Sequence, residues 1–406
     1  MKQNRFLILI LSISISLASF AFCEPIYSPT WCFSMDLPES FAYSSGDGKD
    51  KFSFEHPDGI KVDTVVYYTE PGKTAQFAST EALANDVQRR LNNRGKINSF
   101  DYRQKRAFII ELSFSVSAAG GRSSPMEGWA LCLELGPSAA DQKANASRPG
   151  NAPPQNNAKP MLLAMAYGPA GKTDLQIMYL SALDSIAPEE SDKLAPGPIT
   201  EFKYPRKNRI SSPVFGLDIN AMIFKEDAEA AQALIDREYN VLRRYINAPN
   251  WKEAWIRLYR AIYRDSFDRL ADIAFKVERK FNVPPLENRE LANNALKWVQ
   301  SFAYERDLMG SDFQNLITAA IEGRGDCDSR SMLWAIIMKQ ASIHSAIMVS
   351  RHYSHAMGLA DLPGAGAHFE VDKQKFLVAE TTAQVDIGLI GETVSEIMHW
   401  IGITFE

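Results

Sequence analysis

The residues best suited to chemistry lie in the last third of this 406-residue chain, around one cysteine. The run GRGDCDSRS places Cys327 between Asp326 and Asp328, behind two glycines and ahead of a buried-helix pattern. Cys327 is therefore expected at a helix N-terminus, where the partial positive charge of the helix lowers a thiol pKa while the two acids raise it. Asp326 is expected as the N-cap. Cys327 is a candidate nucleophile, and the alternative is a small buried apolar residue.

A cysteine nucleophile needs a base within hydrogen-bond reach and a third group that orients the base. His355 starts an apolar, strand-like run, HAMGLA, and Glu380 lies in a second one, KFLVAETT. If these strands are antiparallel neighbours, His355 lies beside Glu380. His368 is the competing base, but SHAMGLADLPGAG leaves room for a hairpin before the strand FEV, which favours His355. His352 is expected at the surface.

The segments GRGDCDSRS, SHAMGL and FLVAETT resemble the transglutaminase-like superfamily, and ALKWVQSFAYERD resembles the helix upstream of its nucleophile. The resemblance covers residues 285–390, and the order Cys, His, acid is also that of papain-like enzymes. It implies an α+β core in which Cys327 is the nucleophile, His355 the general base and then acid, and Glu380 the residue that orients the imidazole. Glu380 stands where the family usually has Asp, and Met357 where it usually has an aromatic residue.

The reaction implied by this resemblance is acyl transfer. Cys327 would attack an amide carbonyl, His355 would protonate the departing amine, and water or a second amine would release the thioester. The Cys327 N–H would supply one oxyanion donor, and the sequence does not identify the second. Peptide hydrolysis, amidase action and amine transfer stay open, although the resemblance favours a hydrolase. The expected partner is a peptide, protein or amide substrate.

Neither a metal ion nor another cofactor is expected. The sequence contains no HExxH motif and no CxxC pair, and it contains no EF-hand loop. His352, His355 and Cys327 as zinc ligands would lack a clear fourth partner.

A non-enzymatic envelope protein is the rival functional class. In that class the transglutaminase-like fold is kept as a binding scaffold, and the N-terminal domain recognises an envelope protein. The presence of a cysteine, a histidine and an acid in the family order favours the enzyme, because a scaffold does not need all three.

The composition excludes one class of partner and predicts several domains. Lys and Arg total 44 against 49 Asp and Glu, for a formal net charge of -5, so the chain has no basic field that would hold nucleic acid. At one domain per roughly 150 residues, the length predicts two or three domains. The patterns described below predict an α+β fold: an α+β sandwich, a helical connector and the catalytic domain.

Residues 1–23 have the order of a secretory signal peptide, with a short basic start and then an apolar and Ser run. Cleavage after Ala21 or after Cys23 would leave small residues at the required positions. We therefore expect an exported protein, periplasmic or extracellular, with no membrane span after cleavage. A membrane anchor and a lipoprotein modified at Cys23 are the alternatives.

Residues 24–190 are predicted to form an α+β sandwich domain, and the runs WCFSMDLPESF and KFSFEHPDGIKV resemble Mog1/PsbP-like domains. The expected elements are one amphipathic helix at 80–92 and five strands at 62–69, 107–116, 129–135, 161–167 and 175–182. Residues 137–160, poor in large apolar side chains, are expected to be a disordered insertion. Cys32 and Cys132 are either a disulfide pair or two buried small apolar residues.

The rest of the chain divides into three predicted parts. Residues 191–223 are rich in Pro and charge and are predicted to be a linker. Residues 224–284 carry apolar side chains at three-to-four spacing, which predicts a helical connector with long helices at 228–245 and 251–281. Residues 285–406 are the predicted transglutaminase-like catalytic domain.

Overall fold

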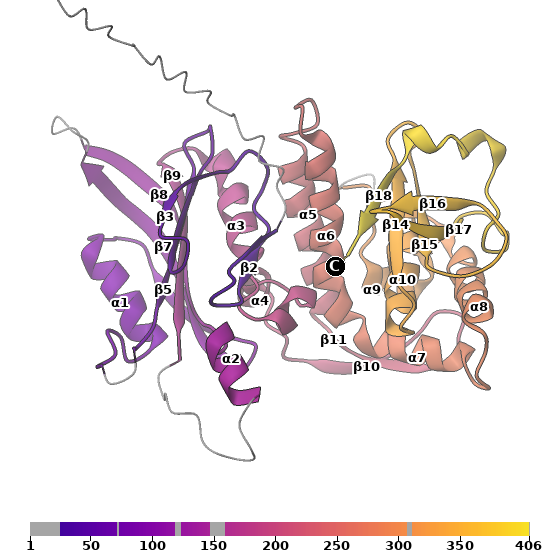
Figure 1. Ribbon diagram of the computed structural model, residues 1–406, viewed down its shortest axis with the longest axis horizontal. Helices are drawn as coiled ribbons and strands as arrows, with labels where there is room; N and C mark the ends of the chain where they lie inside the picture. Colours follow the sequence, from indigo (N-terminus) through magenta and orange to yellow (C-terminus); the bar gives the residue numbers. More distant parts are fainter. Residues whose placement is uncertain (1–24, 71–72, 118–122, 147–158, 307–310, 406) are drawn as a thin grey trace, which may run out of the picture.

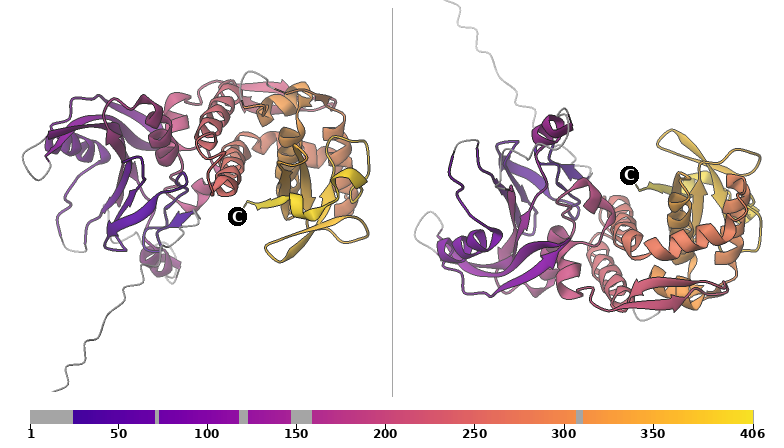
Figure 2. Two further views of the ribbon diagram at one scale, coloured as in Figure 1. Left: turned by 90° about the horizontal axis from the view of Figure 1, so that it is seen from above. Right: turned by 90° about the horizontal axis from the view of Figure 1, so that it is seen from below.

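The computed structural model describes residues 25–405, except for 71–72, 118–122, 147–158 and 307–310. A seven-stranded sheet lies at one end of the long axis, a five-stranded sheet lies at the other, and helices fill the space between them (Figure 1). The views from above and below show the same order of layers (Figure 2). The predicted α+β class is confirmed. The predicted signal peptide at 1–23 lies outside the described residues.

The N-terminal sheet is antiparallel and has the strand order β3-β4-β5-β9-β8-β7-β6. Helix α1 covers one face, where Leu83 packs in a cluster with Ile110, and helix α3 covers the other, where Tyr179 packs in a cluster with Leu131. The predicted helix at 80–92 and the first four predicted strands are therefore confirmed. The bounds are β1 Ile26–Tyr27, β2 Ser34–Met35, β3 Ala42–Gly46, β4 Lys51–Glu55, β5 Lys61–Tyr67, α1 Thr80–Arg90, β6 Ile97–Tyr102, β7 Lys105–Ser117, β8 Ser123–Glu134 and β9 Met161–Pro169.

The fifth predicted strand, at 175–182, is wrong because this segment is helical. It forms a 3-10 turn at Thr173–Leu175 and helix α3 at Gln176–Asp184. Helix α3 lies between the sheet and helix α5 (Asp227–Leu242), so most of its side chains are buried and no single apolar stripe marks it. A short apolar run fits a buried strand and a buried helix equally well, and periodicity alone cannot separate the two.

Cys32 and Cys132 are free thiols, so the disulfide alternative is wrong. Cys132 lies in β8 and packs in the same cluster as Leu83 of α1. Cys32 lies in a turn with a φ of 59°, between Trp31 and Phe33 of the core on the other face of the sheet. The two thiols thus belong to different faces. Burial raises the pKa of Cys132, as expected for a small buried apolar residue.

The predicted disordered insertion at 137–160 begins with a helix, α2, at Ala139–Ala146. The Ser138 hydroxyl accepts a hydrogen bond from the Asp141 N–H at 3.2 Å and donates to the Asp141 carboxylate at 2.7 Å. A capping Ser followed three residues later by an acid, and then by alanines, favours a helix over disorder. The prediction of disorder is therefore wrong for residues 139–146, and residues 147–158 lie outside the described residues.

The predicted linker and connector contain more regular structure than expected. The linker carries helix α4 and the hairpin β10–β11, and the second long helix is broken at Leu270, which separates α6 from α7. Leu270 is fully buried, and no Pro or Gly marks this break in the sequence. Among the described helices, none combines the length and the apolar composition needed to cross a bilayer. The bounds are η2 Glu190–Leu194, α4 Pro198–Lys203, β10 Arg209–Pro213, β11 Asn220–Phe224, α5 Asp227–Leu242, α6 Trp251–Arg269 and α7 Ala271–Phe281.

The C-terminal sheet is antiparallel, has the order β16-β17-β15-β14-β18, and carries helix α10 on one face. Gly358 of β15 lets the Trp334 ring of α10 lie directly on the strand, since a Cβ there would come within 2.5 Å of the ring. The helix that starts at Cys327 is thereby fixed on the strand that starts at His355. The bounds are α8 Asn288–Gln300, β12 Ala303–Tyr304, α9 Leu316–Glu322, β13 Arg324–Gly325, α10 Cys327–Gln340, β14 Ser345–Ser350, β15 His355–Ala360, β16 His368–Val371, β17 Gln374–Ala379, η3 Glu392–Val394, η4 Ile397–His399 and β18 Ile401–Thr404.

A buried carboxyl in the N-terminal half makes the stability of the fold dependent on pH. Glu39 is 2% exposed, and among the described residues neither of its carboxyl oxygens has a hydrogen-bond partner. Burial raises the pKa of Glu39 from 4.5 to about 7, against a smaller opposing effect of Arg257. Because the folded state keeps this proton up to a higher pH than the unfolded state, the free energy of unfolding falls as pH rises from 4.5 to about 7.

Glu39→Gln removes this titration. We expect the variant to be more stable than the wild type at pH 8, by at most about 3 kcal/mol, and to gain nothing at pH 4.5. Urea unfolding at both pH values measures the difference, with the exposed Glu55→Gln as the matched control. A stability difference between Glu39→Gln and wild type that does not change with pH would contradict the assignment.

Candidate active site

Cys327 is the first residue of helix α10, and the two glycines before it have separate roles. Gly323 ends helix α9 with a left-handed φ of 64°, and a Cβ there would overlap the Phe215 ring. Gly325 lies against the Ser329 hydroxyl, 2.6 Å from where a Cβ would stand. Asp326 is the N-cap, as predicted, and accepts a hydrogen bond from the Ser329 N–H at 2.8 Å. The loop therefore brings Cys327 to the helix start.

His355 and Glu380 meet as predicted, although β17 ends at Ala379, so that Glu380 follows the strand in place of lying within it. Strands β15 and β17 are antiparallel neighbours, and His355 Nε2 lies 2.8 Å from Glu380 Oε2. The other oxygen, Oε1, accepts from the Thr382 N–H at 2.7 Å and from the Thr382 hydroxyl at 2.6 Å. Burial raises the pKa of Glu380, but the hydrogen bonds from His355 and Thr382 outweigh burial and leave the pKa below its usual value. Glu380 is therefore an ionised partner that holds one ring nitrogen of His355.

The Cys327 thiol is in a different state from the one that its helix position suggested. Cys327 is 1% exposed, and its Sγ donates to Asp328 Oδ2 at 3.5 Å and not to His355. Burial raises the pKa of the thiol, the charges of Asp328 and Asp326 raise it further, and the Ala356 N–H lowers it by less. Of the two opposing effects expected from the sequence, the one that raises the thiol pKa therefore dominates, because desolvation and the two acids outweigh the helix dipole.

Tyr259, on helix α6, is a site residue that the sequence did not indicate. Its hydroxyl donates to Asp328 Oδ1, it is 3% exposed, and its ring lies 6.1 Å from that of Phe313. Burial raises the pKa of Asp328, and the hydrogen bonds from Tyr259 and Cys327 lower it by less. Burial also raises the pKa of Asp326 to about 8, with Asp328 adding to the rise. Helix α6 therefore contributes directly to the surroundings of Cys327.

Arg330 is a second residue that the sequence analysis missed. It is 2% exposed and donates to the carbonyl oxygens of Gly325 at 3.1 Å, Phe302 at 2.7 Å and Thr381 at 3.5 Å. These contacts join the loop before Cys327 to the segment that carries Glu380. A buried arginine one turn into an otherwise apolar helix was the available signal, because a buried charge requires several partners.

The other two histidines considered in the sequence, His352 and His368, lie away from the His355–Glu380 pair. His352 is exposed in the turn before β15, as predicted, and stacks on His399 with ring centres 4.1 Å apart. His368 starts β16 opposite Leu377, and its Nδ1 contacts the carbonyl of Gly366 at 2.8 Å. Of the two competing histidines, His355 is therefore the one paired with Glu380. Within the described residues, no group of three or more His, Cys, Asp or Glu side chains lies close enough to hold a metal ion.

Asp328→Asn tests whether Asp328 suppresses the thiolate. Removal of the negative charge beside Cys327 lowers the thiol pKa, so we expect iodoacetamide to alkylate Cys327 at least about threefold faster at pH 8, since each unit of pKa is tenfold in thiolate fraction. Peptide mapping of the alkylated protein gives the rate, and the exposed Asp361→Asn serves as the matched control. Slower alkylation would instead identify Asp328 as the base that accepts the thiol proton.

Comparison with known proteins adds little. No protein-family model and no curated protein matches the chain. A solved structure from Bacteroides thetaiotaomicron is 9% identical, with a TM-score of 0.24, over 58% of this chain and 78% of the other. A proposed protease from Parabacteroides distasonis is 9% identical, with a TM-score of 0.21, over 86% of this chain and 70% of the other. Matches at these TM-scores do not define a fold family, so function must be inferred from the residues.

Proposed function

We propose that the protein is an exported, transglutaminase-like cysteine hydrolase that cleaves peptide or amide bonds through a thioester on Cys327. The observation that carries the proposal is the 2.8 Å contact between His355 Nε2 and Glu380 Oε2, on the strand against which the Cys327 helix packs. The resemblance of GRGDCDSRS, SHAMGL and FLVAETT to the transglutaminase-like superfamily points to the same three residues.

The proposed chemistry follows from which ring nitrogen Glu380 holds. With Nε2 as the donor to Glu380, His355 Nδ1 keeps a lone pair and can accept the thiol proton. Sγ of Cys327 then attacks the amide carbonyl, the C–N bond breaks, and the imidazolium of His355 gives its proton to the departing amine. Water, deprotonated by His355, attacks the thioester, and the C–S bond breaks to restore the thiol. The Cys327 N–H, at the helix start, is the proposed first oxyanion donor.

The resting thiol has to be activated before this reaction starts. Substrate binding would have to bring Cys327 from Asp328 to His355, because the thiol hydrogen is directed to Asp328 in the structure. Apo hydrogen bonds of catalytic groups commonly tighten only in the substrate complex. The two acids would then keep the thiol neutral, and so protected from oxidation, until a substrate is bound.

A non-enzymatic envelope scaffold is the second candidate function. It is favoured by one observation, the burial of Cys327 together with its raised pKa, which is typical of an inert structural cysteine. In this alternative the N-terminal sandwich would recognise an envelope protein.

Product analysis separates the two proposed functions. The mature protein is incubated with a pool of short peptides, with and without monodansylcadaverine as an amine acceptor, and the products are identified by mass spectrometry. We expect hydrolysis by the wild type and by Cys32→Ala, and none by Cys327→Ala. Dansyl-labelled peptides would identify amine transfer as the favoured outcome. Turnover that survives in Cys327→Ala would overturn the proposal, and no turnover by any variant would favour the scaffold.

A further inference from the structure

A cavity of about 480 Å³ lies where the N-terminal half, the helical layer and the C-terminal sheet meet, away from Cys327. Its volume is in the range of small-molecule sites. Helix α10 connects it to the candidate active site, because Lys339, in the last turn of the helix that begins at Cys327, lines the cavity. The other lining residues come mainly from β2 and the residue after it, η2, α5, α6 and the end of the chain.

Most of the charges around the cavity neutralise one another. Arg257 donates to Glu238 at 2.7 Å, and Arg260 forms two hydrogen bonds with Asp36 at 3.0 and 3.1 Å. Arg237 is held by Asp184 and Glu238. The two remaining acids of the wall are paired as well, Glu190 with Lys193 at 2.8 Å and Asp265 with Arg269 at 2.8 Å. Each carboxylate of the lining therefore has a basic partner.

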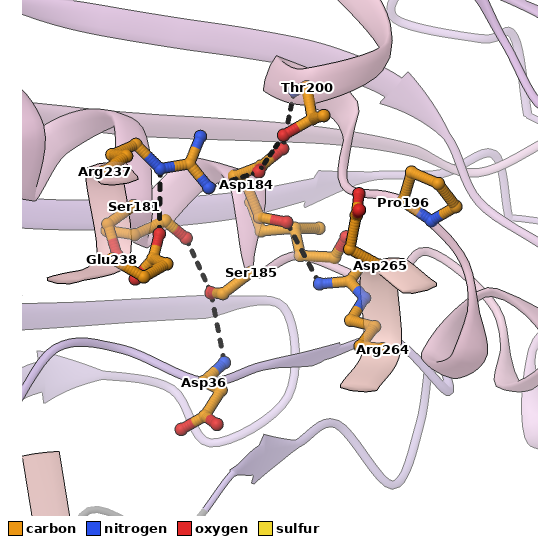
Figure 3. A network of polar contacts seen from close by, with 12 residues as sticks. Asp36, Ser181, Asp184, Ser185, Pro196, Thr200, Arg237, Glu238, Arg264 and Asp265 are labelled. Atoms are coloured by element: carbon orange, nitrogen blue, oxygen red, sulfur yellow. Dashed lines mark hydrogen bonds and ion pairs between the residues drawn. The ribbon is translucent and has the colours of Figure 1, made fainter. Parts of the chain in front are cut away.

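Two cations of the cavity lining, Arg264 and Lys339, have no such carboxylate partner among the described residues. Arg264 donates to the backbone carbonyls of Asp184 at 3.0 Å and Ile186 at 2.8 Å, and Figure 3 shows its guanidinium beside this part of the network. Its Nε has no hydrogen-bond partner among the described residues. Carbonyl dipoles do not cancel a full charge, and neither Arg264 nor Lys339 has a carboxylate within ion-pair distance in the described part of the chain. The cavity wall thus carries two cations, Arg264 and Lys339, that form no ion pair within the described residues.

Part of the remaining wall is apolar and preformed. The rings of Tyr263 and Phe405 are stacked, with centres 3.9 Å apart and planes at 2°, and Leu234 and Met35 also line the cavity. Rigid aromatic rings beside a few charged groups are typical of sites that bind an organic ligand and fix its orientation.

We propose that this cavity is a binding site for a small organic anion, a molecule with an apolar body and a carboxylate or phosphate group. Arg264 and Lys339 would hold the anionic group, and the stacked Tyr263 and Phe405 would contact the apolar body. A guanidinium and an ammonium are the two side-chain groups that bind such anions best. The proposal does not depend on the chemistry of Cys327.

Fluorescence of 8-anilinonaphthalene-1-sulfonate, an aromatic anion, tests the site in the full mature chain. We expect one probe molecule per chain, displaced by octanoate or octyl phosphate but not by the same concentration of octanol. The more effective of the two anions identifies the head group. Arg264→Gln and Lys339→Gln are each expected to weaken probe binding about tenfold or more, since each removes one of the two charges.

The control is Lys225→Gln, an exposed lysine outside the cavity, which is expected to bind the probe as the wild type does. Near-ultraviolet circular dichroism establishes whether each variant is folded. If Arg264→Gln is not folded, the test rests on Lys339→Gln alone, because Lys339 is partly exposed. Wild-type affinity in the folded variants, or displacement by octanol as effective as that by octanoate, would overturn the proposal. No binding of the probe at millimolar concentration would also overturn it.

Discussion

His355→Ala is expected to slow turnover of 4-nitrophenyl acetate about 10²- to 10⁴-fold, the usual contribution of a positioned general acid and base. The 2.8 Å contact with Glu380 fixes the orientation of the His355 imidazole. Its removal leaves Cys327 beside Asp328 without a base that can also protonate a leaving group. Because Cys327 is almost fully covered, a small activated ester is the chosen substrate.

His368→Ala is the matched control for this prediction, because His368 was the competing base and its ring contacts the Gly366 carbonyl and not Glu380. We expect less than about a twofold change in its rate, as for a surface residue outside the reaction. Glu380→Gln keeps the shape of the side chain but loses the charge. Its turnover rate is therefore expected to lie between those of His355→Ala and His368→Ala. Equal losses in His355→Ala and His368→Ala would contradict the assignment of the base.

Arg269→Met is expected to lower the free energy of unfolding by about 3–5 kcal/mol, because it leaves the buried Asp265 without its cation and leaves the buried Asp227 with Arg206 alone. The Arg269 side chain is 0% exposed and donates to Asp265 at 2.8 and 3.0 Å and to Asp227 at 2.7 Å. It joins the end of α6 to the start of α5, and so fixes the helical layer between the two sheets. Urea unfolding followed by circular dichroism measures the change.

Lys276→Met is the control for Arg269→Met, because it removes an ion pair of the same spacing that is partly exposed. Lys276 pairs with Asp272 four residues earlier in α7, as Arg269 does with Asp265 in α6, but its side chain is 38% exposed and the distance is 3.6 Å. Exposed pairs of this kind contribute about 0.5 kcal/mol or less. A loss below about 1 kcal/mol in Arg269→Met, similar to that of the exposed pair, would show that the buried carboxylates find other compensation.

The elements that were predicted correctly are those whose sequence pattern depends only on residues close together in the chain. The helix at 80–92 has apolar residues at helical spacing and is present as α1, and the predicted strand at 161–167 is present as β9. The pairing of His355 with Glu380 was predictable because it requires only that β15 and β17 be antiparallel neighbours. Asp326 as N-cap followed from the preference of helix starts for short acidic side chains.

The features that were missed depend on contacts between distant segments. Helix α3 resembles a strand in sequence because it is covered on most sides by the sheet and by α5. The thiol pKa is raised by burial, which no local motif reports, and Tyr259 reaches Asp328 from a helix 69 residues earlier in the chain. Arg330 is inconspicuous in sequence because its partners are backbone carbonyls of three separate segments.

The most direct test of the proposed activity is to locate the acyl group after reaction with 4-nitrophenyl acetate. The protein is quenched in acid during the burst, digested and mapped by mass spectrometry. We expect an acetyl thioester on Cys327 in the wild type and in His368→Ala, and none in His355→Ala. The free thiols of Cys32 and Cys132 are internal controls and are expected to stay unmodified. Acetylation of Cys32 in preference to Cys327, or equal labelling of Cys327 with and without His355, would contradict the proposal that Cys327 is a nucleophile activated by His355.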